Sequence, residues 1–179
     1  MIRGSHERIP VGISSCLLGQ PVRHDGGHKR DTRLIDVLGK YFEFLPLCPE
    51  VAIGMGVPRP PIRLTGDPLR PRAVGVQADG LDVTDKLIEY AHSVMASRPR
   101  ISGYIFKQGS PSCGMERVAV YDERGESHAT SSGLYAGVVM AALPSMPVAE
   151  EGRLTDDTFR DRFVERVYSY HNRQRTRGR

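Results

Sequence analysis

The chain has 179 residues, of which 39% are hydrophobic and 26% are charged, and its formal net charge is +4 at pH 7. This size suits a single domain with a real core. No apolar run is long enough to cross a membrane, and the N-terminus lacks the apolar core of a signal peptide, so we expect a cytoplasmic protein without a membrane partner. The mild positive charge permits a nucleic acid or another anionic partner without requiring one.

Periodic runs of apolar residues predict strands and helices in alternation. Short apolar runs that end in a turn are typical of buried strands, and apolar spacings of three and four residues are typical of helices. We expect, in chain order, a strand over 10–15, a helix over 32–42, a strand over 42–47, an irregular segment over 49–72, extended pieces over 72–84, a helix over 84–98, a strand over 101–107, a strand and turn over 117–127, a helix over 131–143, an extended piece over 146–154 and an amphipathic helix over 156–172. Asp31 or Thr32 is expected to cap the first helix, and a serine the helix over 131–143.

This alternation implies βαβ units and predicts an α/β fold, a mostly parallel, Rossmann-like sheet with helices on both faces in a single domain. We expect the domain to cover residues 10–155, after a disordered or tag-like segment over 1–9. The C-terminal helix over 156–172 and a basic tail over 173–179 follow it. In such sheets the loops after the carboxyl ends of the strands lie on one edge, and ligands bind there.

The three cysteines, Cys16, Cys48 and Cys113, cannot form a closed set of disulfides, and a reducing compartment disfavours disulfides in any case. Each follows a predicted strand directly or lies in the loop that leaves it, so all three belong to the same edge of the sheet. They are buried spectators, a catalytic thiol or metal ligands. Three thiolates suit zinc with an open position, which His24 or His28 could fill, or an iron–sulfur cluster in which one iron lacks a protein ligand.

Polar residues accompany two of these cysteines. Glu50 lies two residues beyond Cys48 in the run CPE, and Ser110 and Ser112 flank Pro111 in the run SPSCG. A carboxylate and hydroxyl groups beside an open metal position can carry out acid–base chemistry on a bound substrate. The alternative is that Glu50 caps the following turn and that the serines make hydrogen bonds within their own turn.

Arginines gather in two places. Four lie in or beside the proline-rich segment, and four more lie in the C-terminal run RQRTRGR. Phosphate contacts and solvated surface are both consistent with such clusters. The four arginines of the first group are Arg59, Arg63, Arg70 and Arg72.

The runs VGISSCLLGQPVRHDGGHKR, CPEVAIGMGVPR, KQGSPSCG and EEGRL occur in this order and together resemble the thiouracil desulfidase, or TudS-like, family over roughly residues 10–155. The resemblance implies a [4Fe–4S] cluster held by Cys16, Cys48 and Cys113, with a fourth iron that binds the sulfur of a thiolated pyrimidine. It implies a non-redox conversion of C=S to C=O with release of hydrosulfide. It places the acid–base role on Glu50 and an active-site serine in SPSC, with Ser110 favoured over Ser112.

The chemistry of the residues agrees with this resemblance. Thiocarbonyl sulfur is soft and prefers a soft metal centre. We find no G-x-G-x-x-G run after a strand and no P-loop, and a non-redox reaction needs no nucleotide cofactor. The loop after Cys16 is expected to line the pocket, with Arg23 or Lys29 holding a phosphate or a base carbonyl, although a charged surface loop is the alternative. The pocket residues expected in this loop are Arg23, Asp25, His28 and Lys29.

The resemblance leaves the substrate open between free thiouracil and 4-thiouridine in tRNA. Short family members act on the free base, whereas members fused to a second, helical domain look like tRNA enzymes. The runs GVPRPPIRL and DRFVERVYSYHNR resemble the approach to that second domain. The chain is therefore expected to be either a short form or a protein cut before a second domain.

Three other readings remain. The cysteines could hold a structural metal in an RNA-binding module without catalysis. The same open iron could insert sulfur, which would need ATP or another activating step, and the sequence offers no nucleotide site. One cysteine could act alone as the nucleophile of a thiol enzyme, in which case the other two could be replaced without harm.

Overall fold

The computed structural model describes residues 8–97 and 100–177. Most of the segment 1–9 that the sequence predicts to be disordered lies outside the described residues, as does the end of the basic tail. In the part of the chain that the structure describes, no helix has both the length and the apolar character needed to cross a bilayer.

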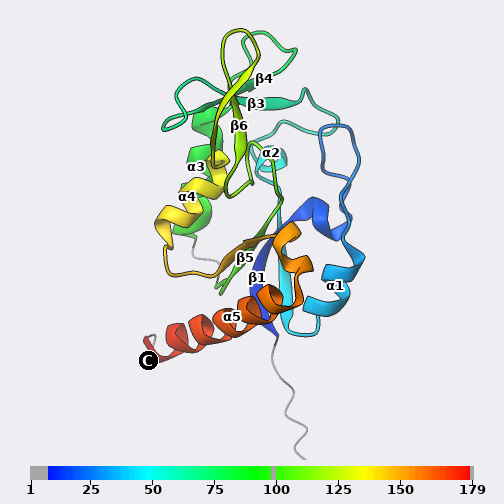
Figure 1. Ribbon diagram of the computed structural model, residues 1–179, viewed down its shortest axis with the longest axis vertical. Coiled ribbons are helices and arrows are strands. Elements are labelled where there is room, and N and C mark those ends of the chain that lie inside the picture. Colours follow the sequence, from blue (N-terminus) through cyan, green and yellow to red (C-terminus); the bar gives the residue numbers. More distant parts are fainter. Residues whose placement is uncertain (1–7, 98–99, 178–179) are drawn as a thin grey trace, which may run out of the picture.

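Four strands form a parallel sheet in the order β2-β1-β5-β8 (Figure 1). β1 lies in the middle, between β2 and β5, and β8 pairs with the other side of β5. Three of the four strands expected from the sequence and the extended piece near residue 150 therefore build one sheet, as the α/β prediction requires. Its members are β1 (Ile9–Ser14), β2 (Phe42–Leu47), β5 (Tyr104–Phe106) and β8 (Val148–Glu150).

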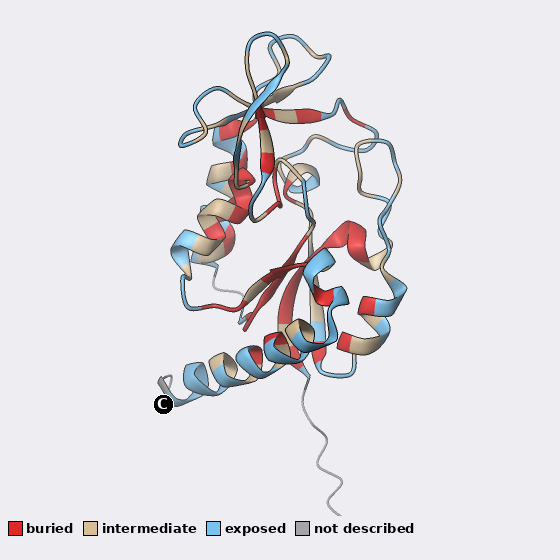
Figure 2. Ribbon diagram, in the orientation of Figure 1, coloured by how far each residue is buried: buried red, intermediate tan, exposed pale blue. Residues whose placement is uncertain are grey.

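Helices cover both faces of this sheet because its central strands carry apolar side chains on both sides. Val11 and Ile13 of β1 are fully buried in a core formed with α1 and α5. Tyr104 and Phe106 of β5 are buried in a second core, against α3 and α4. Figure 2 shows the resulting continuous burial of the central strands. The helices are α1 (Thr32–Leu38), α3 (Thr84–Ala96), α4 (Leu134–Ala142) and α5 (Asp157–Arg177).

A second, mixed sheet stands beyond the first and was not expected from the sequence (Figure 1). Its order is β4-β3-β6-β7, with only the β3–β6 pair parallel. The strand expected over 117–127 belongs to this sheet. β3 lies in the segment expected to be irregular, where the prolines stand beside the strand and not within it. The strands are β3 (Ile62–Thr65), β4 (Arg72–Gly75), β6 (Val118–Tyr121) and β7 (Ser127–Ser131).

Helix α3 joins the two sheets into one α/β domain. Leu87, in its first half, is buried with Leu64 and Val120 of the mixed sheet. Ala91 and Val94, one and two turns further on, are buried against the parallel sheet. One amphipathic helix therefore fixes the position of the mixed sheet relative to the carboxyl edge of the parallel sheet.

The helix ends differ in part from the sequence predictions. Asp31 caps α1, since its Oδ1 accepts the N–H of Leu34 at 2.9 Å. The serine cap expected for α4 is wrong, because Gly133 occupies the cap position and no side chain bonds there. α5 continues through Arg177, beyond the end that the sequence predicts for it.

Candidate active site

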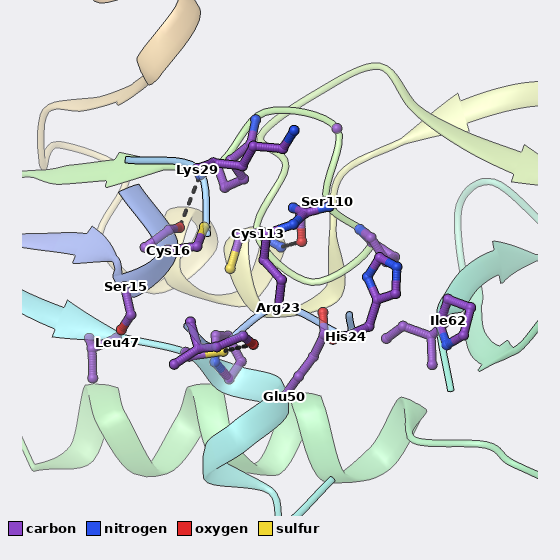
Figure 3. Close-up of a pocket in the computed structure, with 18 of the residues that line it drawn as sticks. Ser15, Cys16, Arg23, His24, Lys29, Leu47, Glu50, Ile62, Ser110 and Cys113 are labelled. Carbon is purple, nitrogen blue, oxygen red and sulfur yellow. Dashed lines mark hydrogen bonds between the residues drawn. The ribbon is translucent and has the colours of Figure 1, made fainter. Parts of the chain in front are cut away.

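The three cysteines face one cavity of about 350 Å³ at the carboxyl edge of the parallel sheet (Figure 3). Cys16 lies in the short 3₁₀ helix η1 (Ser15–Leu18), directly after β1. Cys48 directly follows β2 and precedes the short helix α2 (Pro49–Ala52). Cys113 lies in the turn that leaves β5. Residues far apart in the sequence thus meet because the strands that carry them are neighbours, as the topology predicts.

The turn around Cys113 is shaped by its own backbone and by the start of α4. The Ser110 Oγ accepts the N–H groups of Cys113 at 3.0 Å and of Ser112 at 3.2 Å. The N–H groups of Leu134 and Ala136 donate to the carbonyls of Pro111 and Ser112, both at 3.1 Å. The N–H groups in the first turn of α4, which have no partner within the helix, therefore form hydrogen bonds with this loop. These hydrogen bonds hold the backbone around Cys113 in place.

The run EEGRL has a structural explanation. The Glu150 Oε1 accepts the N–H of Met115 at 2.8 Å, just beyond Cys113. The Glu151 Oε2 accepts the N–H of Gln108 at 2.7 Å, and the same carboxylate forms an ion pair with Lys107. Glu150, the last residue of β8, and Glu151, which follows it, thus hold the two ends of the loop that carries Cys113.

All three cysteines are free thiols. Burial raises the pKa of Cys16, Cys48 and Cys113. Positive charge on Lys107 and Arg23 opposes this rise in the pKa of Cys16. The protein alone therefore keeps its thiols protonated at neutral pH, and a metal centre that binds them as thiolates displaces their protons.

The three thiols limit which kind of metal centre the cavity could hold. Among residues 8–97 and 100–177, no three His, Cys, Asp or Glu side chains are arranged to hold one metal ion. Three sulfurs bound to a single zinc at about 2.3 Å would lie roughly 4 Å apart. Three thiols are also the donor set of a multi-iron cluster in which one iron is free of protein ligands. The three cysteines at the cavity therefore fit an iron–sulfur cluster.

Glu50, in the first turn of α2, is held at both carboxylate oxygens. Its Oε1 accepts the hydroxyl of Ser112 at 2.8 Å. Its Oε2 accepts the Nε–H of Arg59 at 2.8 Å and lies 2.8 Å from Nη2 in an ion pair. The Glu50 side chain is 14% exposed and the Arg59 side chain 3%. Glu50 is thus tied to its surroundings by a hydroxyl and a guanidinium, and it still lines the cavity.

The two serines of SPSCG have different positions. Ser110 lines the cavity, and its hydroxyl oxygen accepts two backbone N–H groups of its own turn. Ser112 is fully buried and donates to Glu50. The sequence argument favours Ser110, whereas the structure brings Ser112 into contact with the carboxylate.

The loop after Cys16 is only partly at the cavity. Arg23 and Lys29 line it, but Asp25 and His28 do not, contrary to the expectation from the sequence. The Asp25 Oδ1 accepts the N–H of Gly27 at 2.9 Å, and the His28 Nδ1 accepts the N–H of Arg30 at 3.2 Å. Both side chains are therefore occupied by the backbone of their own turns. His24 lines the cavity in their place.

The arginines of the proline-rich segment do not form one cluster. Arg59 is buried against Glu50, Arg63 lies over the ring of Tyr121 at 5.3 Å, and Arg72 pairs with Asp82. Sequence reasoning did not identify Arg59 as part of the cavity. It also missed Lys107, for which a signal existed, since Lys107 directly follows the strand that leads to Cys113.

The fold and the site define an α/β protein with three thiols and a paired carboxylate at the carboxyl edge of a parallel sheet. The family described as 2-thiouracil desulfurase matches residues 11–151, and the chain belongs to this family. A solved structure of a [4Fe-4S]-dependent thiouracil desulfidase, TudS, is similar, with 34% sequence identity and a TM-score of 0.60 over 83% of this chain and 94% of that chain. A search of curated proteins found no match.

Proposed function

We propose that this protein is a [4Fe–4S]-dependent desulfidase that converts the C=S group of a thiolated uracil to C=O and releases hydrosulfide. The observation that carries the proposal is the convergence of Cys16, Cys48 and Cys113 with Glu50 at one cavity. Family membership and the similarity to a solved [4Fe-4S]-dependent thiouracil desulfidase support the same chemistry.

The three cysteines would hold the cluster, since they are the only cysteines in the chain and all face the cavity. When bound, the cluster supplies an iron without a protein ligand, which is a soft Lewis acid suited to thiocarbonyl sulfur. The conversion consumes one water and transfers no electrons. The side chains of the protein must therefore orient the substrate and transfer protons.

Glu50 is the residue suited to move the proton. Arg59 occupies its Oε2, whereas its Oε1 accepts only the Ser112 hydroxyl and keeps one acceptor position. We assign to Oε1 one proton of the water that attacks the thiocarbonyl carbon, and Glu50 then returns this proton to the departing sulfur. The second proton of the water is released as the C=O group forms, so the products are the carbonyl compound, hydrosulfide and one proton. Ser112 holds Oε1 in position for both transfers.

Arg23 is suited to orient the substrate. It lines the cavity, and within the described residues its buried Nε has no hydrogen-bond partner and only an ion pair at 3.9 Å with the Asp25 carboxylate. A buried donor without a partner is costly, and the ring carbonyl of a thiolated uracil would satisfy it. Lys29, from the same loop, offers a second cationic donor at the cavity.

We favour a free thiolated base as the substrate. Arg59 and Arg72 are engaged by carboxylates of the protein and Arg63 by an aromatic ring, so Arg70 is the one exposed arginine of the four without such a contact among the described residues. 4-Thiouridine in tRNA is the second candidate, because Arg173 lies exposed near the end of α5.

The test begins with anaerobic reconstitution and a measurement of iron and acid-labile sulfide. We expect about four of each per chain. Sulfide release is then measured with 2-thiouracil and with tRNA that contains 4-thiouridine. Replacing each cysteine in turn by serine is expected to remove the cluster and the activity together.

Three outcomes would contradict this proposal. Zinc or no metal after reconstitution would refute the iron–sulfur mechanism. Two harmless cysteine replacements out of three would favour the thiol enzyme. Glu50→Ala is expected to retain iron and lose sulfide release, and an unchanged rate in this variant would favour a structural metal site.

A further inference from the structure

Arg59 is the most fully engaged polar side chain at the cavity. Its Nε donates to the Glu50 Oε2 at 2.8 Å, and its Nη2 lies 2.8 Å from the same oxygen in an ion pair. Its Nη1 donates to the carbonyls of Val22 at 2.9 Å and Gly56 at 3.0 Å. Nε and Nη1 thus make three hydrogen bonds to protein acceptors, and Nη2 belongs to the ion pair with Glu50.

These contacts fix one carboxylate oxygen and leave the other available. The hydrogen bond from Nε and the ion-pair contact of Nη2 both reach Oε2 from one rigid, planar guanidinium, so a rotation of the carboxylate that moves Oε2 lengthens at least one of them. The Ser112 hydroxyl reaches Oε1 at 2.8 Å and sets the rotation from the other side. Glu50 therefore presents Oε1 in a single direction.

Arg59 also connects Glu50 to the loop that forms the opposite wall. Its backbone N–H donates to the carbonyl of His24 at 2.9 Å, and its side chain bonds Val22 in the same loop. The Val22 carbonyl lies 3.9 Å from the sulfur of Cys48. The same arginine therefore sets the position of the acid–base group relative to a cysteine of the site.

We propose that Arg59 is a positioning residue that acts through Glu50, an inference that rests on the proposed desulfidase function. Its role is to hold Oε1 of Glu50 in line with the reacting carbon, while its own donors stay on protein groups. Lysine keeps the charge but cannot reproduce the two-donor fork. The specific requirement at position 59 is thus for the guanidinium shape.

The test compares wild type, Arg59→Lys and Arg63→Lys as iron-loaded proteins with 2-thiouracil. Arg63 is a matched control, since it lies four residues away, is half-buried and contacts Tyr121 and not Glu50. We expect Arg59→Lys to lower kcat at least about tenfold with KM changed by less than about threefold. Iron content and the far-UV spectrum are expected to match wild type, and Arg63→Lys is expected to behave as wild type.

A crystal structure of Arg59→Lys supplies a readout that does not depend on activity. We expect Glu50 Oε1 to move out of hydrogen-bond reach of the Ser112 hydroxyl, from 2.8 Å in the wild type. An unmoved carboxylate, an unchanged kcat or an effect confined to KM would overturn the inference. Arg59→Gln is prepared alongside, and if neither variant folds and binds iron, Arg59 is a structural residue and the inference fails.

The failure of this inference is distinguishable from that of the proposed function. A wild-type protein that carries a full cluster and releases no sulfide from 2-thiouracil or 4-thiouridine tRNA refutes the function, and the inference with it. An active wild type whose kcat is insensitive to Arg59→Lys refutes the positioning role alone.

Discussion

Ser110 and Ser112 stand two positions apart in SPSCG, yet their hydroxyls have different partners. The Ser112 hydroxyl donates to Glu50, and the Ser110 oxygen accepts two backbone N–H groups. The side chain that contacts the carboxylate can affect proton transfer directly. The side chain that accepts backbone N–H groups affects the shape of the turn that carries Cys113.

Ser112→Ala is therefore expected to lower kcat about tenfold or more and to leave iron content unchanged, because Glu50 Oε1 loses its donor. Ser110→Ala is expected to leave two N–H groups of the turn without an acceptor, which costs about 1–3 kcal/mol of stability and weakens iron retention. Steady-state sulfide release, iron analysis and urea unfolding of both variants check this. The two roles would be reversed if Ser110→Ala had a low kcat with normal stability and iron content while Ser112→Ala was fully active.

Individual site residues were predictable to different degrees. The gathering of the cysteines and Glu50 at one cavity was predictable, because each lies in a segment that follows a strand of the parallel sheet, and strand ends are visible in the apolar pattern. Asp25 and His28 were misplaced, since a pattern cannot show that a side chain turns back to its own backbone. Arg59 was missed because its side chain is buried only when it pairs with Glu50, and the sequence pattern does not show that ion pair.

At the scale of elements, the start of α4 packs directly against the SPSCG turn. Gly133 caps α4, and a Cβ at this position would lie 2.6 Å from the backbone carbonyl of Ser112. No side chain can be added there unless the turn moves. The carbonyls that receive the N–H groups of α4 belong to this same turn.

Gly133→Ala is expected to push the turn away from α4, to destabilise the protein by about 1–3 kcal/mol and to reduce bound iron. Gly137→Ala, one turn further along α4, is the matched control. Its Cβ would meet only the Ser132 hydroxyl, which can rotate away, and alanine favours the helix by about 1 kcal/mol over glycine. Urea unfolding and iron analysis of the two variants decide the matter. Equal effects would show that the helix and not the turn is being perturbed.

The elements of the mixed sheet were the hardest to predict. β3 and β6 have only four residues each, too few for a periodic signal to stand out. The prolines beside β3 are also typical of an irregular loop, so the strand was not predicted. The apolar pattern of the strand after Cys113 does not show which sheet the strand joins. The parallel sheet was predictable because its strands are buried on both faces and read as apolar runs.

At the scale of the whole molecule, the cavity lies between the two sheets. The cysteines follow strands of the parallel sheet, whereas Ile62, the first residue of β3 in the mixed sheet, and the preceding Pro61 also line the cavity. Helix α3 fixes the two sheets together, and the aromatic core behind Cys113 includes Tyr104, which is fully buried. The site therefore depends on the stability of the core that connects both halves.

This core makes the stability of the molecule sensitive to alkaline pH. Burial raises the pKa of Tyr104 and Tyr135 above the usual range for tyrosine, and the two hydroxyls face each other at 3.4 Å. A group whose pKa is raised in the folded state stabilises that state below its unfolded pKa, which for tyrosine is about 10. This stabilisation is lost as the pH rises from there toward the folded pKa, by up to about 1.4 kcal/mol per pH unit for each group.

The free energy of unfolding, measured with urea under anaerobic, reducing conditions, is thus expected to fall steeply above about pH 10. The buried thiols add to the fall from about pH 9 in protein without iron, because their pKa values are raised as well. Replacing both tyrosines by phenylalanine isolates their part and is expected to flatten the curve above pH 10 relative to wild type. Parallel curves for the two proteins would mean that the tyrosine hydroxyls ionise as readily in the folded core as in the unfolded chain.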